Sequence, residues 1–151
     1  GARRNGLEIK AIWSEESHIH KDVVRDNAMY RFAVEGINIT HMGDVGNPLT
    51  EGQMAALAGT DVLLALTGGQ HTIELDDLYR VIQQVKPRLV IPMHYRIPGP
   101  RFFMLPVTDF TAYFPDDAVH WLDSSQIELS RESLPEETQV YVLQPSKTGQ
   151  A

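Results

Sequence analysis

The chain has 151 residues, of which 42% are hydrophobic and 22% charged, a composition typical of one globular domain with its own core. Thirteen Lys and Arg against twenty Asp and Glu give a net charge of −7 with no basic block, so we expect no nucleic-acid partner. The absence of cysteine excludes disulfides, thiolate catalysis and cysteine-bound metals, and fits a reducing cytoplasm. Because no apolar run approaches the ~20 residues of a membrane span, we expect no membrane partner.

Strands dominate the pattern of the first third of the chain. Residues 7–13 alternate apolar and polar side chains, and residues 28–34 are rich in aromatic and other β-forming residues. Residues 37–41 predict a third strand. Glu35-Gly36, which precedes it, is a two-residue hairpin signal, so the second and third strands are expected to pair antiparallel.

Helices and strands alternate after residue 44. Thr50 and Gln53 have the spacing of a capping box and predict the start of a short helix. The nearly continuous apolar run at residues 61–67 predicts a strand buried on both faces. Helical spacing over residues 75–85 and a second apolar run at residues 88–94 predict a further helix and strand. This order favours right-handed crossovers and a largely parallel sheet.

The last third of the chain carries shorter signals. Residues 108–114 predict a short helix with Thr108 as its N-cap. Short strands are predicted at residues 118–122, 126–129 and 139–143. We expect residues 1–151 to form a single domain, with tails at residues 1–6 and 144–151.

Polar and glycine-rich segments follow three of the predicted strands. Ligands of open α/β sheets bind outside the carboxyl ends of the strands. Asp44 comes after the first of these strands, Gly68-Gly69 comes after the second, and His94 ends the third. Asp and His are the metal ligands left to a cysteine-free chain. The sequence therefore predicts that Asp44 and His94 lie at one edge of the sheet and form part of a metal site.

Each of these residues also has a structural interpretation. Asp44 can cap a turn, and His94 can be a hydrogen-bonded core histidine. Gly68-Gly69 lacks the sequence context of a phosphate-binding loop and is more often a simple turn. His18 and His20 form an HxHxD pattern that places both imidazoles on one side of an extended segment, a usable metal geometry, but a solvated polar loop has the same residue types.

Three segments together resemble a known family. Residues 39–46 (ITHMGDVG), 61–72 (DVLLALTGGQHT) and 86–95 (KPRLVIPMHY) resemble, in order and spacing, the second half of metallo-β-lactamase-fold metal-dependent hydrolases, above all the ascorbate-6-phosphate lactonase-like branch. The resemblance covers roughly residues 7–115. It implies an α/β fold, namely one αβ half of an αββα sandwich, with a mixed sheet and helices on one side.

The resemblance also implies a set of metal ligands. Asp44 matches the Asp that bridges two metals, and His94 matches the His that binds the second metal, so both would act directly in catalysis. A His in the loop before the hairpin binds the first metal in the family. We assign this role to His18, with His20 as its substitute. The implied cofactor is a divalent metal, zinc or manganese, with two ions in the complete family site.

The implied reaction is hydrolysis of a small molecule, in which a metal-activated hydroxide attacks a lactone, an ester or a phosphoester. His41 is expected to orient the ligands, and Thr72 to cap the following helix. The family's HxHxDH motif belongs to an N-terminal half that this chain lacks, and residues 18–23 imitate it but end in Val23. We therefore expect only the C-terminal part of the site, inactive alone. The alternative is a non-catalytic half-domain that serves as a binding or assembly module.

In the αββα sandwich of the resembled family, each half covers one face of the other half's sheet, so a chain with only one half is expected to leave that face uncovered. Strands Val62–Leu66 and Leu89–Ile91 are expected to contribute to this face. Large exposed apolar patches are uncommon on soluble monomers. We therefore expect a homodimer, or association with the missing N-terminal half.

Overall fold

The computed structural model describes residues 2–4, 7–16, 26–69, 71–98 and 103–146. Its strands are β1 (Ala2–Arg4), β2 (Leu7–Glu15), β3 (Asp26–Val34), β4 (Ile37–His41), β5 (Val62–Leu66), β6 (Leu89–Met93), β7 (Val119–Trp121) and β8 (Gln139–Val142). Its helices are α1 (Glu51–Ala56), α2 (Leu75–Val85) and α3 (Val107–Thr111), with a 3-10 turn at Asp116–Ala118. No helix among these is long and apolar enough to cross a membrane.

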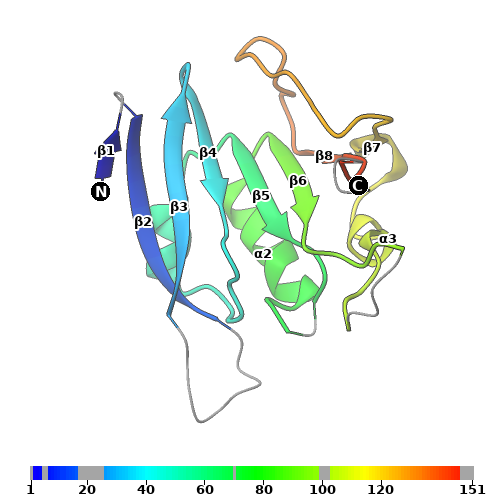
Figure 1. Ribbon diagram of the computed structural model, residues 1–151, viewed down its shortest axis with the longest axis horizontal. Helices are drawn as coiled ribbons and strands as arrows, with labels where there is room; N and C mark the ends of the chain where they lie inside the picture. The colour runs from blue at the N-terminus through cyan, green and yellow to red at the C-terminus, as the bar shows by residue number, and fades with distance from the viewer. Residues whose placement is uncertain (1, 5–6, 17–25, 70, 99–102, 147–151) are drawn as a thin grey trace, which may run out of the picture.

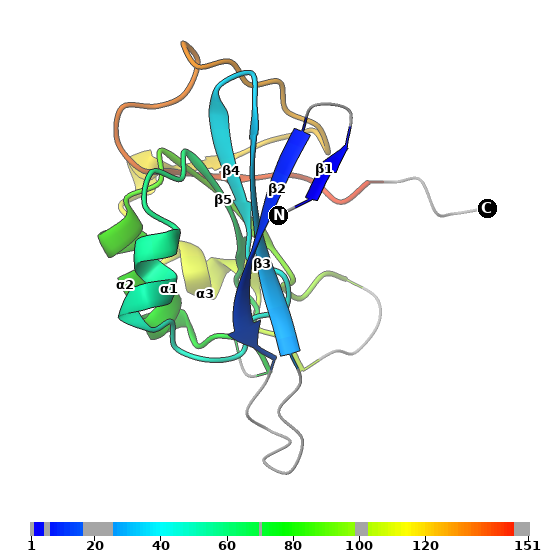
Figure 2. The same cartoon turned by 90° about the vertical axis from the view of Figure 1, so that its left-hand side faces the viewer.

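The strands form one sheet in the order β1-β2-β3-β4-β5-β6-β8-β7 (Figure 1). Strands β1 to β4 pair antiparallel, and β4, β5, β6, β8 and β7 pair parallel. The three α-helices lie on the same face of this sheet (Figure 2). The expected α/β fold, with a mixed sheet and helices on one side, is confirmed.

The antiparallel part follows the local signals of the sequence. Glu35 and Gly36 have φ angles of +49° and +78° and join β3 to β4, as a two-residue hairpin turn requires. Residues 2–4 pair with β2, so the tail expected at residues 1–6 is in part a strand. Without β1, the backbone N–H and C=O groups along the outer edge of β2 would have no strand partner. Even the three-residue strand β1 can pair with them.

The parallel part confirms the two-sided burial expected of its strands. Val62 and Leu63, which point to opposite faces of the sheet, are 2% and 0% exposed. Between β5 and β6 the chain crosses over through α2. This helix ends at Lys86, whose φ of +52° is left-handed and directs the chain into Pro87 and β6.

Two expectations for the last third are wrong. The N-cap of α3 is Pro106 rather than Thr108, because Pro106 holds an extended backbone and the helix begins directly after it. Residues 126–129 form no strand. Leu129 instead packs on the sheet as part of an irregular segment, so its alternation with polar neighbours reflects contact with the sheet rather than strand pairing. Strands β7 and β8 agree with the predictions.

Apolar side chains gather on both faces of the sheet. The larger cluster lies under the helices and includes Met29, Leu78 and Phe110. The smaller one, on the opposite face, includes Val62 and Leu89 under Leu129 and Leu134. Val62 and Leu89 are therefore buried, and the expectation that their strands leave an uncovered face is wrong for these residues.

A cap substitution tests the local signals. Thr50 accepts a hydrogen bond from Gln53 N (3.2 Å), and the Gln53 side chain accepts one from Thr50 N (2.9 Å). Thr50→Ala is therefore expected to lower the free energy of unfolding by about 1 kcal/mol in urea titrations. Thr108→Ala is the matched control, since Thr108 makes no side-chain cap. Equal losses in both variants would contradict the capping box.

Candidate metal centre

The candidate ligands Asp44 and His94 lie at one edge of the sheet. Strands β4, β5 and β6 are parallel neighbours, so their carboxyl ends meet at the same edge (Figure 1). Asp44 lies three residues beyond the end of β4, and His94 directly follows β6. Gly68 follows the strand between them. The structure places the two residues at a common edge, with β5 separating their strands.

A tight loop holds Asp44. Gly43 has a φ of +66°, and a Cβ atom at this position would lie 2.6 Å from both Ala28 O and Asn27 Oδ1. The Asp44 backbone N–H donates to Asn27 Oδ1 (2.9 Å), and Asn27 Nδ2 donates to Met42 O (3.2 Å). Asn27 therefore ties the loop to β3, and only glycine fits the close approach at residue 43.

His41 supports the same loop. Its Nδ1 accepts a hydrogen bond from the Gly43 backbone N–H (2.9 Å), so the proton of the neutral ring lies on Nε2. The half-buried ring thereby stabilises the turn that leads to Asp44. Its role in orienting a metal ligand remains a prediction.

Thr72 does not cap a helix. The N-cap of α2 is Glu74, with no side-chain cap, and Thr72 lies two residues before it. The Thr72 hydroxyl instead donates to Gly69 O (3.3 Å) and closes the turn after β5. Since Ile73 N–H donates to Val45 O (2.8 Å), this turn is joined to the Asp44 loop.

His94 has an unusual backbone. Its φ of +54° is left-handed, a conformation that costs a non-glycine residue about 1–3 kcal/mol and is concentrated at functional sites. The Thr67 N–H donates to Met93 O (3.0 Å) and fixes the preceding residue. A Cβ atom on Gly68 would lie 2.2 Å from His94 O, so the glycine lets the strained carbonyl pack against β5. The His94 side chain is exposed.

The glycine pair after β5 is a packing turn. Gly68 and Gly69 are both buried, and Gly69 lies against Leu105. Contacts with the protein therefore account for both residues, and a phosphate-binding role has no support here.

Tyr95 follows His94 but turns back into the fold. Its hydroxyl donates to Leu143 O (3.4 Å), and burial raises the pKa of this hydroxyl above its ordinary value. Tyr95 therefore stays protonated near neutral pH, and we assign it no role as a base.

The two candidate ligands fit a divalent metal in type but not in number. Carboxylate and imidazole donors suit zinc and manganese. Within the described ranges, no group of three or more His, Asp or Glu residues is placed to hold a metal ion. The other candidates, His18 and His20, lie outside the described residues. The described edge thus supplies part of a ligand set.

Two features of this edge have only weak signals in the sequence. Asn27 holds the Asp44 loop from 17 residues away, and its one sequence signal is that Asn is unfavourable in a strand. Gly68 stands out only as one of two adjacent glycines. No sequence signal indicates that Gly68 lies against His94.

Comparison with known proteins identifies the family. The Beta-lactamase superfamily domain matches residues 2–94, a range that includes Asp44 and ends at His94. This chain belongs to the β-lactamase superfamily. It is similar to a UPF0173 metal-dependent hydrolase of Thermoplasma acidophilum, with 29% identity over 90 residues, which are 60% of this chain and 40% of the relative. The chain therefore spans less than half the length of this curated relative.

Two solved structures share the fold of this chain. A protein of Thermotoga maritima, assigned as a Zn-dependent hydrolase of the metallo-β-lactamase superfamily, matches with a TM-score of 0.76 and 32% identity, over 92% of this chain and 66% of that one. A protein of Parabacteroides distasonis assigned as a metal-dependent hydrolase matches with a TM-score of 0.57 and 12% identity, over 91% of this chain and 52% of that one. At 12% identity the second match shows the fold alone.

Proposed function

We propose that this β-lactamase superfamily chain supplies one metal-binding edge of a metal-dependent hydrolase. Asp44 and His94 are its ligands, and His18 or His20 adds a third. The observation that carries the proposal is the left-handed backbone of His94, whose carbonyl packs closely against Gly68 at the edge where Asn27 holds Asp44. Glu35 and Lys86 share this conformation at a hairpin turn and a helix end, whereas His94 adopts it beside a second candidate ligand, and such strain is concentrated at functional sites.

The chemistry follows from the donor types. A divalent metal, zinc or manganese, when bound, supplies an activated water and stabilises negative charge on a carbonyl or phosphoryl oxygen. The proposed substrate is a small lactone, ester or phosphoester. His41 and Asn27 keep the Asp44 loop in place, and Gly68 leaves room for the His94 carbonyl. Since the described ligand set is incomplete, this chain alone is expected to show at most trace hydrolysis.

A second candidate is a non-catalytic binding or assembly module. The two candidates differ in one property, because only the hydrolase requires metal binding through Asp44 and His94.

Calorimetric titration of the chain with zinc tests the proposal. We expect Asp44→Asn and His94→Asn each to weaken zinc binding at least tenfold, since each removes a ligand; ~10–100-fold losses follow even from changes to groups that only support ligands. Asn tolerates the left-handed backbone of residue 94, so His94→Asn keeps the fold.

His120→Asn is the matched control, because His120 is an exposed histidine of β7 that hydrogen-bonds Gln139. Equal zinc affinity in all three variants would contradict the assignment. A chain that binds no zinc at all would favour the assembly module.

A further inference from the structure

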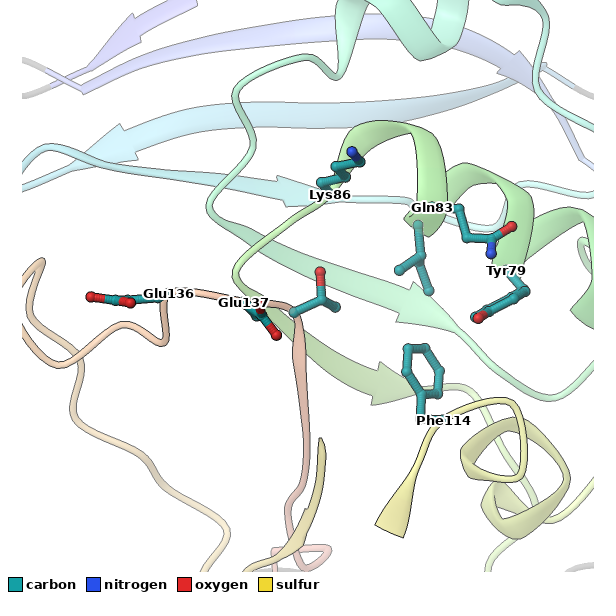
Figure 3. Close-up of a pocket in the computed structure, with 8 residues that line it drawn as sticks. Tyr79, Gln83, Lys86, Phe114, Glu136 and Glu137 are labelled. Atoms are coloured by element: carbon teal, nitrogen blue, oxygen red, sulfur yellow. The ribbon is translucent and has the colours of Figure 1, made fainter. Parts of the chain in front are cut away.

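A cavity opens beside α2, and Figure 3 shows the residues that line it. Its volume of 490 Å³ falls within the ~300–1,000 Å³ of small-molecule sites. It is lined by Tyr79, Ile82, Gln83, Lys86, Phe114, Glu136, Glu137 and Thr138. Lys86 and Thr138 shortly precede β6 and β8, which run parallel, so the cavity lies near the amino ends of these strands.

Aromatic rings build one wall of the cavity. Tyr79 and Phe114 meet edge to face with ring centroids 5.5 Å apart. Tyr113 packs against Tyr79 at 5.1 Å, and Phe110 packs against Phe114 at 5.2 Å, so neighbouring rings hold both in place. Tyr79 and Phe114 are only half-buried, and the buried Ile82 lies beside them. The wall is thus preformed and accessible.

Two carboxylates stand on the opposite rim. Arg88 Nη2 donates to Leu134 O (2.9 Å), and the Thr138 hydroxyl donates to Pro87 O (2.6 Å). These bonds anchor the chain on both sides of Glu136 and Glu137. Figure 3 shows Glu136 extending away from the rings, while Glu137 lies nearer to them. The short segment between the anchors therefore presents Glu137 to the cavity.

The electrostatics of the cavity favour a cation. The eleven-residue helix α2 ends at its rim, and the carboxyl end of a helix carries partial negative charge. Neither Glu137 nor Lys86 has an ion-pair partner among the described residues. In Figure 3 the Lys86 side chain extends away from Phe114.

We propose that this cavity binds a small organic ammonium ion with an aromatic or short apolar group. The apolar group packs against Tyr79 and Phe114, and the ammonium lies beside Glu137. None of these residues belongs to the proposed metal centre, so the two sites share no side chain.

NMR titration of the ¹⁵N-labelled chain with phenethylammonium tests the proposal. We expect amide shifts concentrated at Gln83, Phe114 and Thr138. Phenylacetate carries the same ring with a negative charge, and ethylammonium carries the charge without the ring. Both should bind at least about fivefold more weakly, because each lacks one of the two interactions. Equal binding of phenylacetate, or shifts located elsewhere, would overturn the proposal.

Two substitutions of glutamate by glutamine test whether the charge of Glu137 contributes to phenethylammonium binding. Glu137→Gln is expected to weaken phenethylammonium binding about three- to fivefold, as loss of one exposed ion pair allows. Glu132→Gln is the control, because Glu132 is an exposed carboxylate of the same segment that does not line the cavity. If the two variants bind alike, the proposal is wrong. Since no metal is added, failure here leaves the hydrolase proposal untouched.

Discussion

A Gly68→Ala variant is expected to lose about 2–4 kcal/mol of its free energy of unfolding. The added Cβ atom would lie 2.2 Å from His94 O and 3.3 Å from Met104 Cβ. The nearer atom is backbone, and the Thr67 N–H bond to Met93 O (3.0 Å) restrains it. Relief therefore requires β5 and the His94 turn to separate. Urea unfolding followed by circular dichroism measures the loss.

Gly52→Ala provides the matched control. Gly52 lies in α1, and the nearest atom to its added Cβ is Thr50 Oγ1 at 4.0 Å. This variant is expected to gain about 0.5–1 kcal/mol, because alanine favours a helix over glycine. If the proposed function holds, Gly68→Ala also weakens zinc binding, measured under conditions in which the variant is folded. Gly52→Ala is expected to leave zinc binding unchanged. Similar stability in the two variants would refute the packing argument.

Local signals were enough to predict the elements that carry the site. The Glu35-Gly36 turn needs two positive φ angles, and the capping box needs only residues three apart, so each is encoded within a few neighbouring residues. The order of strands and helices then placed Asp44 and His94 at one edge, since parallel neighbours end together.

The contacts that shape the site could not be predicted in this way. Asn27 and Asp44 are 17 residues apart, and their contact depends on the pairing of β3 with β4 and on the turn at Gly43. The left-handed backbone of His94 accompanies a close approach of its carbonyl to Gly68, which follows the neighbouring strand β5 and lies 26 residues earlier in the chain. The N-cap of α3 was misplaced for a related reason, because Pro106 sets the backbone there without any side-chain hydrogen bond.

The face of β2 and β3 opposite the helices carries exposed aromatic rings. Ile12 and Met29 point into the core beneath the helices, so their neighbours Trp13 and Tyr30 point to the other face. Trp13 is 56% exposed and Tyr30 46% exposed. Trp13 pairs with Ala28 and Tyr30 with Ala11, which makes the two rings diagonal neighbours. Covering a few hundred Å² of such surface, at ~25 cal/mol per Å², contributes several kcal/mol.

We propose that two copies of the chain associate through this face. At micromolar concentration, light scattering is expected to give the wild-type protein a mass near twice the 17.0 kDa of one chain. The variant with both Trp13→Lys and Tyr30→Lys is expected to have the mass of one chain. The two added charges would have to be buried in the dimer, which is costly.

Trp121→Lys is the matched control, since Trp121 is 55% exposed but lies on β7 at the far edge of the sheet. A wild-type mass of 17.0 kDa at every concentration would exclude the homodimer. A monomeric chain could then be mixed with a separately produced N-terminal αβ half of the sandwich. If the wild-type chain bound this half and the variant with both substitutions, Trp13→Lys and Tyr30→Lys, did not, we would assign the face to contact with the N-terminal half. In either case burial of the two rings supplies the apolar contribution to association.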